Sequence, residues 1–248
     1  MLHYSNELGP TDNEATISDT AYCVNGAGEK IPLMKKIHRG YLIAIEGIDG
    51  AGKSSLMAAI AALLTQQQLP VLLTREPGGT PLGQQLRQIL QHRQFPVCPT
   101  AEYLLFAADR AEHFNSIVLP NLAQNKIVIS DRMGDSSLVY QGFGRGLPLE
   151  KLALINRWAM GERQPDLVLY LRLDPAVANQ RIQQRVGQEA GQLSSFEQEQ
   201  ASFRQQVAQG FDTVFHNRPD VFTLDGAQAI HSLAQQAYNK IITQLGQL

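Results

Sequence analysis

Short apolar runs alternate with longer stretches of helical spacing from Tyr41 to the end of the chain. The apolar runs that predict strands are "YLIAIE" (41–46), "VLLT" (71–74), "KIVIS" (126–130), "LVLYL" (167–171) and "VFTL" (221–224). Helical spacing marks the segments 55–68, 81–91, 100–125 and 227–245. Strands that alternate with helices indicate an α/β fold, in which a five-stranded parallel sheet carries helices on both faces.

The beginning of the chain lacks this pattern. Residues 1–36 are polar, acidic early on and without sustained periodicity, so we predict a disordered N-terminal extension there and one folded domain over 37–248. The extension has the features of neither a secretory signal nor a transit peptide. Met34 precedes "KKIHRG" and is a hypothetical alternative start. Inside the domain, the Gln-rich segment 183–200 is expected to be a mobile loop.

Composition narrows the class of protein. The chain has 248 residues, 44% of them apolar, and a formal net charge of −2. This balance argues against a broad nucleic-acid surface, and no apolar run approaches the ~20 residues of a membrane span. The only cysteines, Cys23 and Cys98, make a disulfide framework or a Cys-based zinc site unexpected and suit a reducing cytosol. We therefore expect a cytoplasmic protein without a nucleic-acid or membrane partner.

A phosphate-binding pattern separates the first apolar run from the first helix. Gly47, four further residues and then Gly52-Lys53-Ser54 match G-x-x-x-x-G-K-[ST]. Glycines let backbone N–H groups point into one concavity, the lysine adds a charge for the outer phosphates, and the serine offers a hydroxyl to Mg²⁺. The candidate ATP-binding residues are Gly47, Ile48, Asp49, Gly50, Ala51, Gly52, Lys53, Ser54 and Ser55.

Two further patches suggest a second ligand. Arg75 follows the second strand, where open α/β sheets bind ligands, and its guanidinium can fork onto a phosphate. Phe106 and Arg110 are four residues apart on one helix face, so they can stack on a flat base and bond its edge. The alternatives are a surface arginine paired with Glu76, and a core phenylalanine beside a solvated arginine.

A third patch follows the third strand. Asp131 ends this apolar run, where P-loop enzymes place a carboxylate for Mg²⁺, and Arg132 comes next in reach of a phosphate. Ser136, Tyr140 and Gln141 follow, about one helical turn apart. The alternative is an N-terminal cap followed by an ordinary helix, but the P-loop elsewhere in the chain favours a functional site.

Six stretches in order resemble bacterial thymidylate kinases. They are "EGIDGAGKSS", "TREPGGTPLG", "AEYLLFAADR", "SDRMGDSSLVYQG", "PDLVLYLRLDP" and "LDGAQAI". The resemblance implies the P-loop nucleoside monophosphate kinase fold and transfer of the γ-phosphoryl group of ATP to dTMP, giving dTDP and ADP with Mg²⁺. It also implies a homodimer.

The same resemblance assigns roles on the dTMP side. Arg75 and Arg132 would hold the phosphate, Phe106 would stack on thymine, and Arg110 would bond a base carbonyl. Tyr140 would crowd the sugar C2′ and disfavour ribonucleotides. The other residues lining the base pocket would be Ser136 and Gln141.

On the donor side, Asp49 would face the sugar 3′-hydroxyl and the phosphoryl region, and Arg181 would lie near adenine. The 183–200 segment would act as a lid. It carries Ser194 and Ser195 where the family has Asp-Arg, so Arg185 becomes the candidate lid cation, with Arg204 behind it. The residues expected to act on the transferring phosphoryl group are Asp49, Lys53, Arg132 and Arg185, and those expected to hold Mg²⁺ are Ser54 and Asp131.

Two other functions stay open at this level. One is a kinase of another pyrimidine nucleotide, such as dUMP, because the pocket residues favour a pyrimidine without fixing its 5-methyl group. The other is a P-loop protein that binds nucleotide without turnover, which the atypical lid favours.

Overall fold

The computed structural model describes residues 22–24, 30–32, 37–91, 95–189 and 193–246. These fall into two compact units, 1–35 and 36–248. In the first unit, strands β1 (Tyr22–Val24) and β2 (Lys30–Pro32) form an antiparallel pair. The rest of the extension, including Met34, lies outside the described residues, so its disorder stays a prediction.

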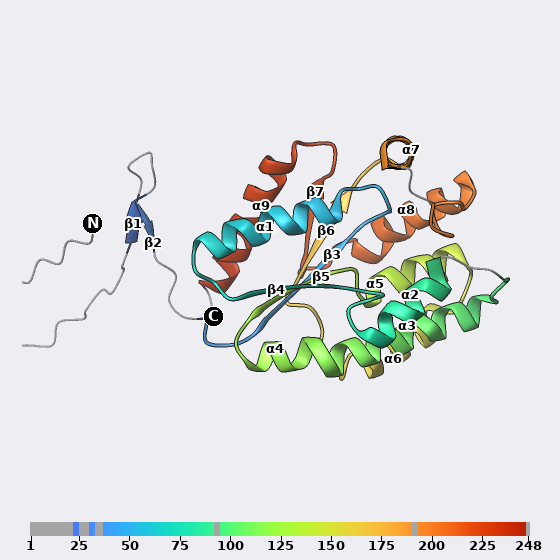
Figure 1. Cartoon of the computed structure of the whole chain (residues 1–248), viewed down its shortest axis with the longest axis horizontal. Coiled ribbons are helices and arrows are strands. Elements are labelled where there is room, and N and C mark those ends of the chain that lie inside the picture. Colours follow the sequence, from blue (N-terminus) through green and yellow to red (C-terminus); the bar gives the residue numbers. More distant parts are fainter. Residues whose placement is uncertain (1–21, 25–29, 33–36, 92–94, 190–192, 247–248) are drawn as a thin grey trace, which may run out of the picture. The chain divides into compact units, whose positions relative to one another are not determined.

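The second unit is built on a five-stranded parallel sheet. Its strands are β3 (Tyr41–Glu46), β4 (Val71–Arg75), β5 (Ile127–Asp131), β6 (Leu167–Arg172) and β7 (Val221–Asp225). They run in the order β4-β5-β3-β6-β7 (Figure 1). The central strand β3 is buried along its whole length, as expected of a parallel sheet covered on both faces. The predicted α/β fold is confirmed.

Helices cover the two faces of this sheet. They are α1 (Lys53–Gln66), α2 (Pro81–Gln91), α3 (Pro99–His113), α4 (Leu119–Ala123), α5 (Gly134–Ser137), α6 (Leu149–Ala159), α7 (Pro175–Glu189), α8 (Ala201–Phe215) and α9 (Ile230–Leu245). Figure 1 shows α1 and α9 on one side of the sheet and α3, α4 and α6 on the other. None of the helices among the described residues is long and apolar enough to cross a membrane.

The expected helix over 100–125 is a continuous run of α3, the π-helical turn η1 (Phe114–Val118) and α4. Pro120 lies in the first turn of α4, just after η1. Because proline cannot donate a backbone hydrogen bond, a wider turn directly before it is a physically reasonable adjustment.

The expected mobile loop is shorter than the sequence suggests. Helix α7 continues to Glu189, so 183–189 are helical, and the non-helical residues that the structure describes here are 193–200. Gln and Arg are good helix formers, which explains why the helix extends into the Gln-rich segment.

Candidate active site

The P-loop lies at the carboxyl edge of the sheet, between β3 and α1. Gly47 and Gly52 have φ angles of 144° and 101°, which side chains rarely adopt. A Cβ on Gly47 would lie 2.5 Å from the Leu171 carbonyl oxygen, so the loop needs glycine there. The Lys53 ammonium folds back and donates to the carbonyls of Gly47 (3.2 Å) and Ile48 (2.9 Å). Burial, followed by the nearby charge of Arg132, lowers the pKa of Lys53.

The two expected metal-binding residues are in contact. The Ser54 hydroxyl donates to Asp131 Oδ2 over 3.1 Å. Hydroxyl and carboxylate oxygens are ligands that Mg²⁺ accepts, and Mg²⁺ in such sites takes its other ligands from water and substrate phosphates. Among the residues that the structure describes, no group of three or more His, Cys, Asp or Glu side chains could hold a metal by itself. A hydroxyl and a carboxylate at this distance fit two of the oxygen ligands of a Mg²⁺ ion.

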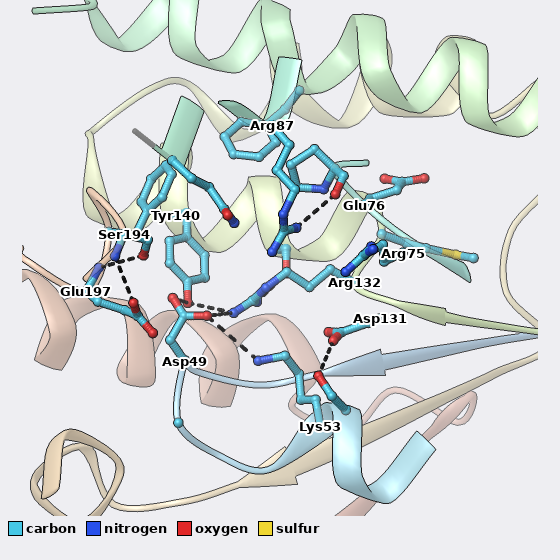
Figure 2. Close-up of a pocket in the computed structure, with 18 of the residues that line it drawn as sticks. Asp49, Lys53, Arg75, Glu76, Arg87, Asp131, Arg132, Tyr140, Ser194 and Glu197 are labelled. Carbon is cyan, nitrogen blue, oxygen red and sulfur yellow. Dashed lines mark hydrogen bonds and ion pairs between the residues drawn. The ribbon is translucent and has the colours of Figure 1, made fainter. Parts of the chain in front are cut away.

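A cavity of about 690 Å³ opens beside the P-loop (Figure 2). The predicted site residues that line it are Asp49, Gly50, Gly52, Lys53, Ser54, Ser55, Arg75, Phe106, Arg110, Asp131, Arg132, Ser136, Tyr140, Gln141, Arg181 and Arg185. Gly47, Ile48 and Ala51 do not line it. Both sets of predicted ligand contacts, those for ATP and those for the acceptor, therefore share one space.

Arg132 connects three other polar side chains that line this cavity. Its guanidinium donates to Asp49 Oδ1 (2.6 Å), the Tyr140 hydroxyl (3.0 Å) and Ser136 Oγ (2.8 Å). Figure 2 shows the Asp49 carboxylate between Arg132 and Lys53. Burial alone would raise the pKa of Asp49, but Arg132 and Lys53 hold it at about 2. Arg132 also has a φ of 71°, an unusual left-handed conformation for a side chain other than glycine.

Glu46 is a buried carboxylate next to Arg132, and the sequence analysis did not select it as a site residue. It is fully buried, accepts from the Met133 backbone N–H (2.8 Å) and Ser136 Oγ (2.5 Å), and lies 4.0 Å from the Arg132 guanidinium. Burial raises the pKa of Glu46 to about 7, against the opposing effect of Arg132. An acidic residue directly before the first P-loop glycine, at the end of an apolar run, is the pattern that identifies it.

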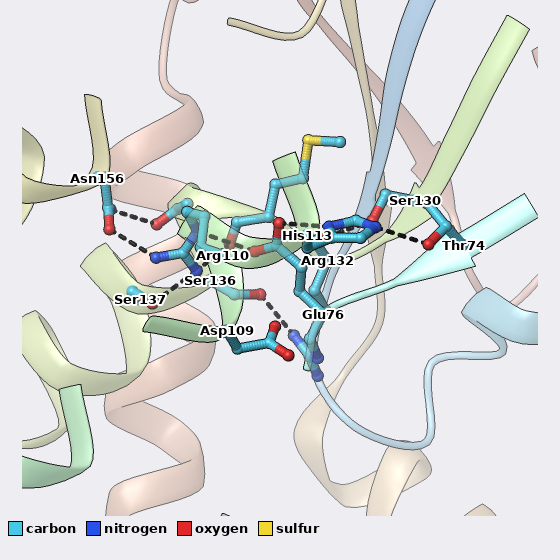
Figure 3. Close-up of polar contacts among 12 residues, drawn as sticks. Thr74, Glu76, Asp109, Arg110, His113, Ser130, Arg132, Ser136, Ser137 and Asn156 are labelled. Carbon is cyan, nitrogen blue, oxygen red and sulfur yellow. Dashed lines mark hydrogen bonds and ion pairs between the residues drawn. The ribbon is translucent and has the colours of Figure 1, made fainter. Parts of the chain in front are cut away.

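Arg110 is buried rather than solvated, which rules out the alternative of an exposed helix charge. Its Nε donates to Glu76 (2.8 Å) and its Nη1 to Asn156 Oδ1 (2.7 Å), as Figure 3 shows. Its Nη2 donates to the Met133 carbonyl (3.3 Å) and Ser137 Oγ (3.1 Å). Within the described chain these acceptors engage four of the five guanidinium N–H groups, which leaves one N–H on Nη1 of a side chain that lines the cavity.

Glu76 links Arg110 to a second buried group. It accepts from Arg110 and lies 3.0 Å from His113 Nδ1, while His113 Nε2 lies 2.6 Å from Thr74 Oγ1 (Figure 3). Burial alone would raise the pKa of Glu76, but Arg110 and then His113 hold it below its ordinary value. The pairing of Glu76 with Arg110 also excludes the alternative in which Glu76 neutralises Arg75.

Two arginines line the acceptor side of the cavity without a carboxylate partner. The Arg75 side chain makes no hydrogen bond or ion pair with a described residue, and among these residues the Arg87 side chain donates to the Pro77 carbonyl alone, over 2.9 Å. Burial, and then the charge of Arg75, lowers the pKa of Arg87. Sequence reasoning missed Arg87 because an arginine inside a helix gives no sign of the loop it reaches.

The two serines of the atypical lid have structural partners. Ser194 and Glu197 form a reciprocal cap: the Ser194 N–H donates to Glu197 Oε2 (2.9 Å) and the Glu197 N–H to Ser194 Oγ (3.3 Å). The N–H and hydroxyl of Ser195 both donate to the Gln91 carbonyl at the end of α2, over 2.8 and 3.0 Å. Phe196 then packs against Phe106, with ring centroids 5.9 Å apart.

The arginines expected on the donor side have different surroundings. Arg181 donates to the carbonyls of Ala51 and Gly226, over 3.2 and 3.0 Å, next to the P-loop. Arg185 lines the cavity and is paired with Glu197 at 2.6 Å. Arg204 donates to the Glu199 carbonyl and does not line this cavity.

Comparisons with known proteins agree on one family. Residues 45–237 match the family model described as thymidylate kinase. A thymidylate kinase of Synechococcus sp. (strain JA-2-3B'a(2-13)) is 42% identical over 186 residues, covering 75% of this chain and 86% of that protein. One of Chlorobium chlorochromatii is 39% identical over 211 residues, covering 82% and 95%. The crystal structure of thymidylate kinase from Ehrlichia chaffeensis superposes with a TM-score of 0.64 at 28% identity, covering 80% and 98%.

Proposed function

This chain belongs to the thymidylate kinase family, and we propose that its cavity holds ATP and dTMP with their phosphates facing each other. It is a dTMP kinase, a phosphotransferase that yields dTDP and ADP. The observation that carries the proposed arrangement is that Lys53, Arg132 and Arg110 line one cavity. We assign this activity to residues 37–248, with 183–200 as the lid, and the two nucleotide substrates support a location in the cytoplasm.

On the donor side, the P-loop backbone and Lys53 would hold the ATP phosphates. Phosphate oxygens would replace the two carbonyls that Lys53 now contacts, and Arg181 would lie along adenine. Ser54 and Asp131 would hold Mg²⁺, which supplies positive charge to the phosphate oxygens. Arg185, paired with Glu197, remains the proposed lid cation.

On the acceptor side, three arginines would bind the dTMP phosphate. Arg132 is fixed by Asp49, and Arg75 and Arg87 contribute charges that no carboxylate among the described residues neutralises. Two anionic phosphates repel each other, so a cluster of cations between them lowers the barrier to approach, and phosphoryl transfer depends mainly on such positioning and charge.

The base would lie between Phe106 and the buried polar side chains. The free N–H of Arg110 fits a base carbonyl, Gln141 completes the edge, and Tyr140 faces the sugar C2′. Ser136 is bonded to Glu46 and Arg132, so we propose that it holds the phosphate-binding arginine in addition to lining the base pocket.

An ADP-release assay with MgATP tests this function. We expect the highest kcat/KM with dTMP, a value for dUMP lower by ~10–200-fold because one methyl group contributes that much, and a value for dCMP lower by up to ~10⁴–10⁵-fold because cytosine would leave buried polar groups of the pocket unpaired. Equal or faster ADP release with dUMP or dCMP would contradict the assignment of dTMP as the preferred acceptor. No ADP release with any acceptor would indicate a protein that binds nucleotide without turnover.

A homodimer is proposed from an apolar surface that crosses three adjacent helices. Helices α2 and α3 pack together, as do α3 and α6 (Figure 1). Their exposed large apolar side chains are Leu82, Ile89, Leu104, Leu149, Leu154 and Trp158. Leu154 and Trp158 are four residues apart and share a face of α6, where Trp158 is 80% exposed. Exposed apolar patches of this kind mark protein contact surfaces, and tryptophan is enriched among the residues that dominate binding.

Replacing Trp158 with glutamate is expected to weaken self-association at least ~30-fold, equivalent to about 2 kcal/mol, because it places a charge in an apolar contact. Analytical ultracentrifugation over a concentration series measures the effect. Val177→Glu is the matched control, since Val177 is also exposed but lies on α7. A Trp158→Glu protein that dimerises as tightly as the parent would exclude this surface.

A further inference from the structure

A buried carboxylate lies directly behind the base side of the cavity. Glu102 is 1% exposed, and its Oε1 accepts a hydrogen bond from Gln141 Nε2 over 2.8 Å. Gln141 is equally buried and lines the cavity, whereas Glu102 does not. Glu102 comes from α3 and Gln141 from the π-helical turn η2 (Leu138–Gly144), so the contact joins two elements that both border the base pocket.

The Glu102 carboxylate is held by an arginine. Arg145 Nη2 lies 3.4 Å from Glu102 Oε2 and 2.5 Å from Glu199 Oε1, at the end of the lid segment. The Arg145 guanidinium also lies over the Phe203 ring, 4.5 Å from its centroid. Arg145 therefore pairs with both carboxylates, and the Glu102 oxygens accept hydrogen bonds from Arg145 and Gln141.

A carboxylate paired with an arginine fixes which way the neighbouring amide points. Such a group accepts hydrogen bonds only, so the NH₂ of Gln141 must face Glu102, and the amide oxygen is the polar atom left for a ligand. A base edge therefore meets a donor from Arg110 and an acceptor from Gln141. Thymine and uracil present the complementary pattern, O4 as acceptor and N3–H as donor, whereas cytosine presents N4–H₂ as donor and N3 as acceptor.

We propose that Glu102 is a positioning residue that locks the Gln141 amide and thereby makes the base pocket reject cytosine. This inference rests on the proposed function, because it concerns the same acceptor pocket. Rejection is strong because a wrong base would leave buried polar groups unpaired, and a pocket built for hydrogen bonds discriminates by up to ~10⁴–10⁵-fold in such cases.

The test is the ratio of kcat/KM for dTMP to kcat/KM for dCMP in Glu102→Gln. A glutamine at 102 can offer either oxygen or NH₂ to Gln141, so the Gln141 amide becomes free to turn and to accept cytosine. We expect the ratio to fall at least tenfold from the parent value. Because both substrates are measured on one preparation, partial unfolding lowers both rates and leaves the ratio unchanged. A ratio within twofold of the parent would overturn the proposal.

Two variants serve as controls. Glu199→Gln makes the same chemical change on the other partner of Arg145 but leaves Glu102 in place, so its ratio should match the parent. Glu102→Asp keeps an acceptor-only group, so its ratio should stay well above that of Glu102→Gln. A fall of the same size in all three variants would also overturn the proposal, because it would reflect general loosening of the pocket.

Should Glu102→Gln fail to fold, a crystal structure of the parent protein with bound dTMP tests the role of Glu102 instead. The proposal requires Gln141 Nε2 on Glu102 and Gln141 Oε1 within hydrogen-bond distance of thymine N3, and any other arrangement contradicts it. Different results would disprove the proposed function and the proposed role of Glu102. A parent that releases no ADP with dTMP disproves the proposed function, whereas a parent active on dTMP with an unchanged ratio in Glu102→Gln disproves only the role of Glu102.

Discussion

Arg132→Ala is expected to lower kcat/KM for dTMP by at least ~10³-fold while the protein still binds ATP. Arg132 bridges Asp49, Ser136 and Tyr140 and lines the cavity, so in the proposed arrangement its loss removes a cation that would face both phosphates. An arginine that stabilises a transferring phosphoryl group contributes ~10³–10⁵ in rate in related chemistry. ATP binding should persist because the P-loop contacts come from other residues.

Steady-state kinetics with dTMP, together with calorimetric titration of ATP, measures both parts. The variant should fold, because Glu46, whose pKa is already raised to about 7 by burial, can take up a proton when its neighbouring cation is removed. Arg132→Lys is the control that keeps a charge but loses the fork onto Asp49 and Tyr140, so it should be intermediate. Turnover of Arg132→Ala within tenfold of the parent would exclude the acceptor role.

Arg110→Met is expected to lower the free energy of unfolding by about 3–5 kcal/mol, the usual effect of removing one partner from a buried ion pair. Arg110 and Glu76 are each about 2% exposed, and the substitution removes the guanidinium from the Glu76 carboxylate, which keeps its contact with His113 Nδ1. Asn156, the Met133 carbonyl and Ser137 also lose their contacts with the guanidinium, so four buried polar groups lose a partner.

Urea unfolding of Arg110→Met and of the double variant Arg110→Met/Glu76→Gln separates the causes. The double variant should be more stable than Arg110→Met alone, since it no longer buries an unpaired charge. A double variant less stable than the single one would mean that Glu76 is not the source of the cost. Lost activity in Arg110→Met is expected as well, but it does not bear on this comparison.

The sheet could be predicted from the sequence because each strand is a continuous apolar run. The differences lie at the strand ends. Four predicted strands stop one residue early, and the structure extends them to Arg75, Asp131, Arg172 and Asp225. Backbone pairing continues past the last apolar side chain at this edge of the sheet, where Arg75 and Asp131 line the cavity and Arg172 pairs with Asp212.

The site could be predicted only where its residues sit in local motifs. The P-loop, Arg75 and the Asp131–Arg132 pair follow strands and are identified by that position. Glu102 and Arg87 carry no such mark, since their roles depend on partners brought close by folding, such as Gln141 for Glu102. The pattern of a single sequence predicts the local structure of a segment, but it does not predict which distant side chains the segment contacts after folding.

The backbone of Arg132 is a place where stability and activity favour different residues. Holding a side chain other than glycine at a φ of 71° costs ~1–3 kcal/mol of conformational energy, which glycine would avoid. Glycine would also remove the guanidinium. Selection for a higher free energy of unfolding therefore favours glycine at this position, whereas selection for a higher turnover rate favours arginine. The enzyme keeps the strained arginine, and its surrounding contacts maintain that conformation.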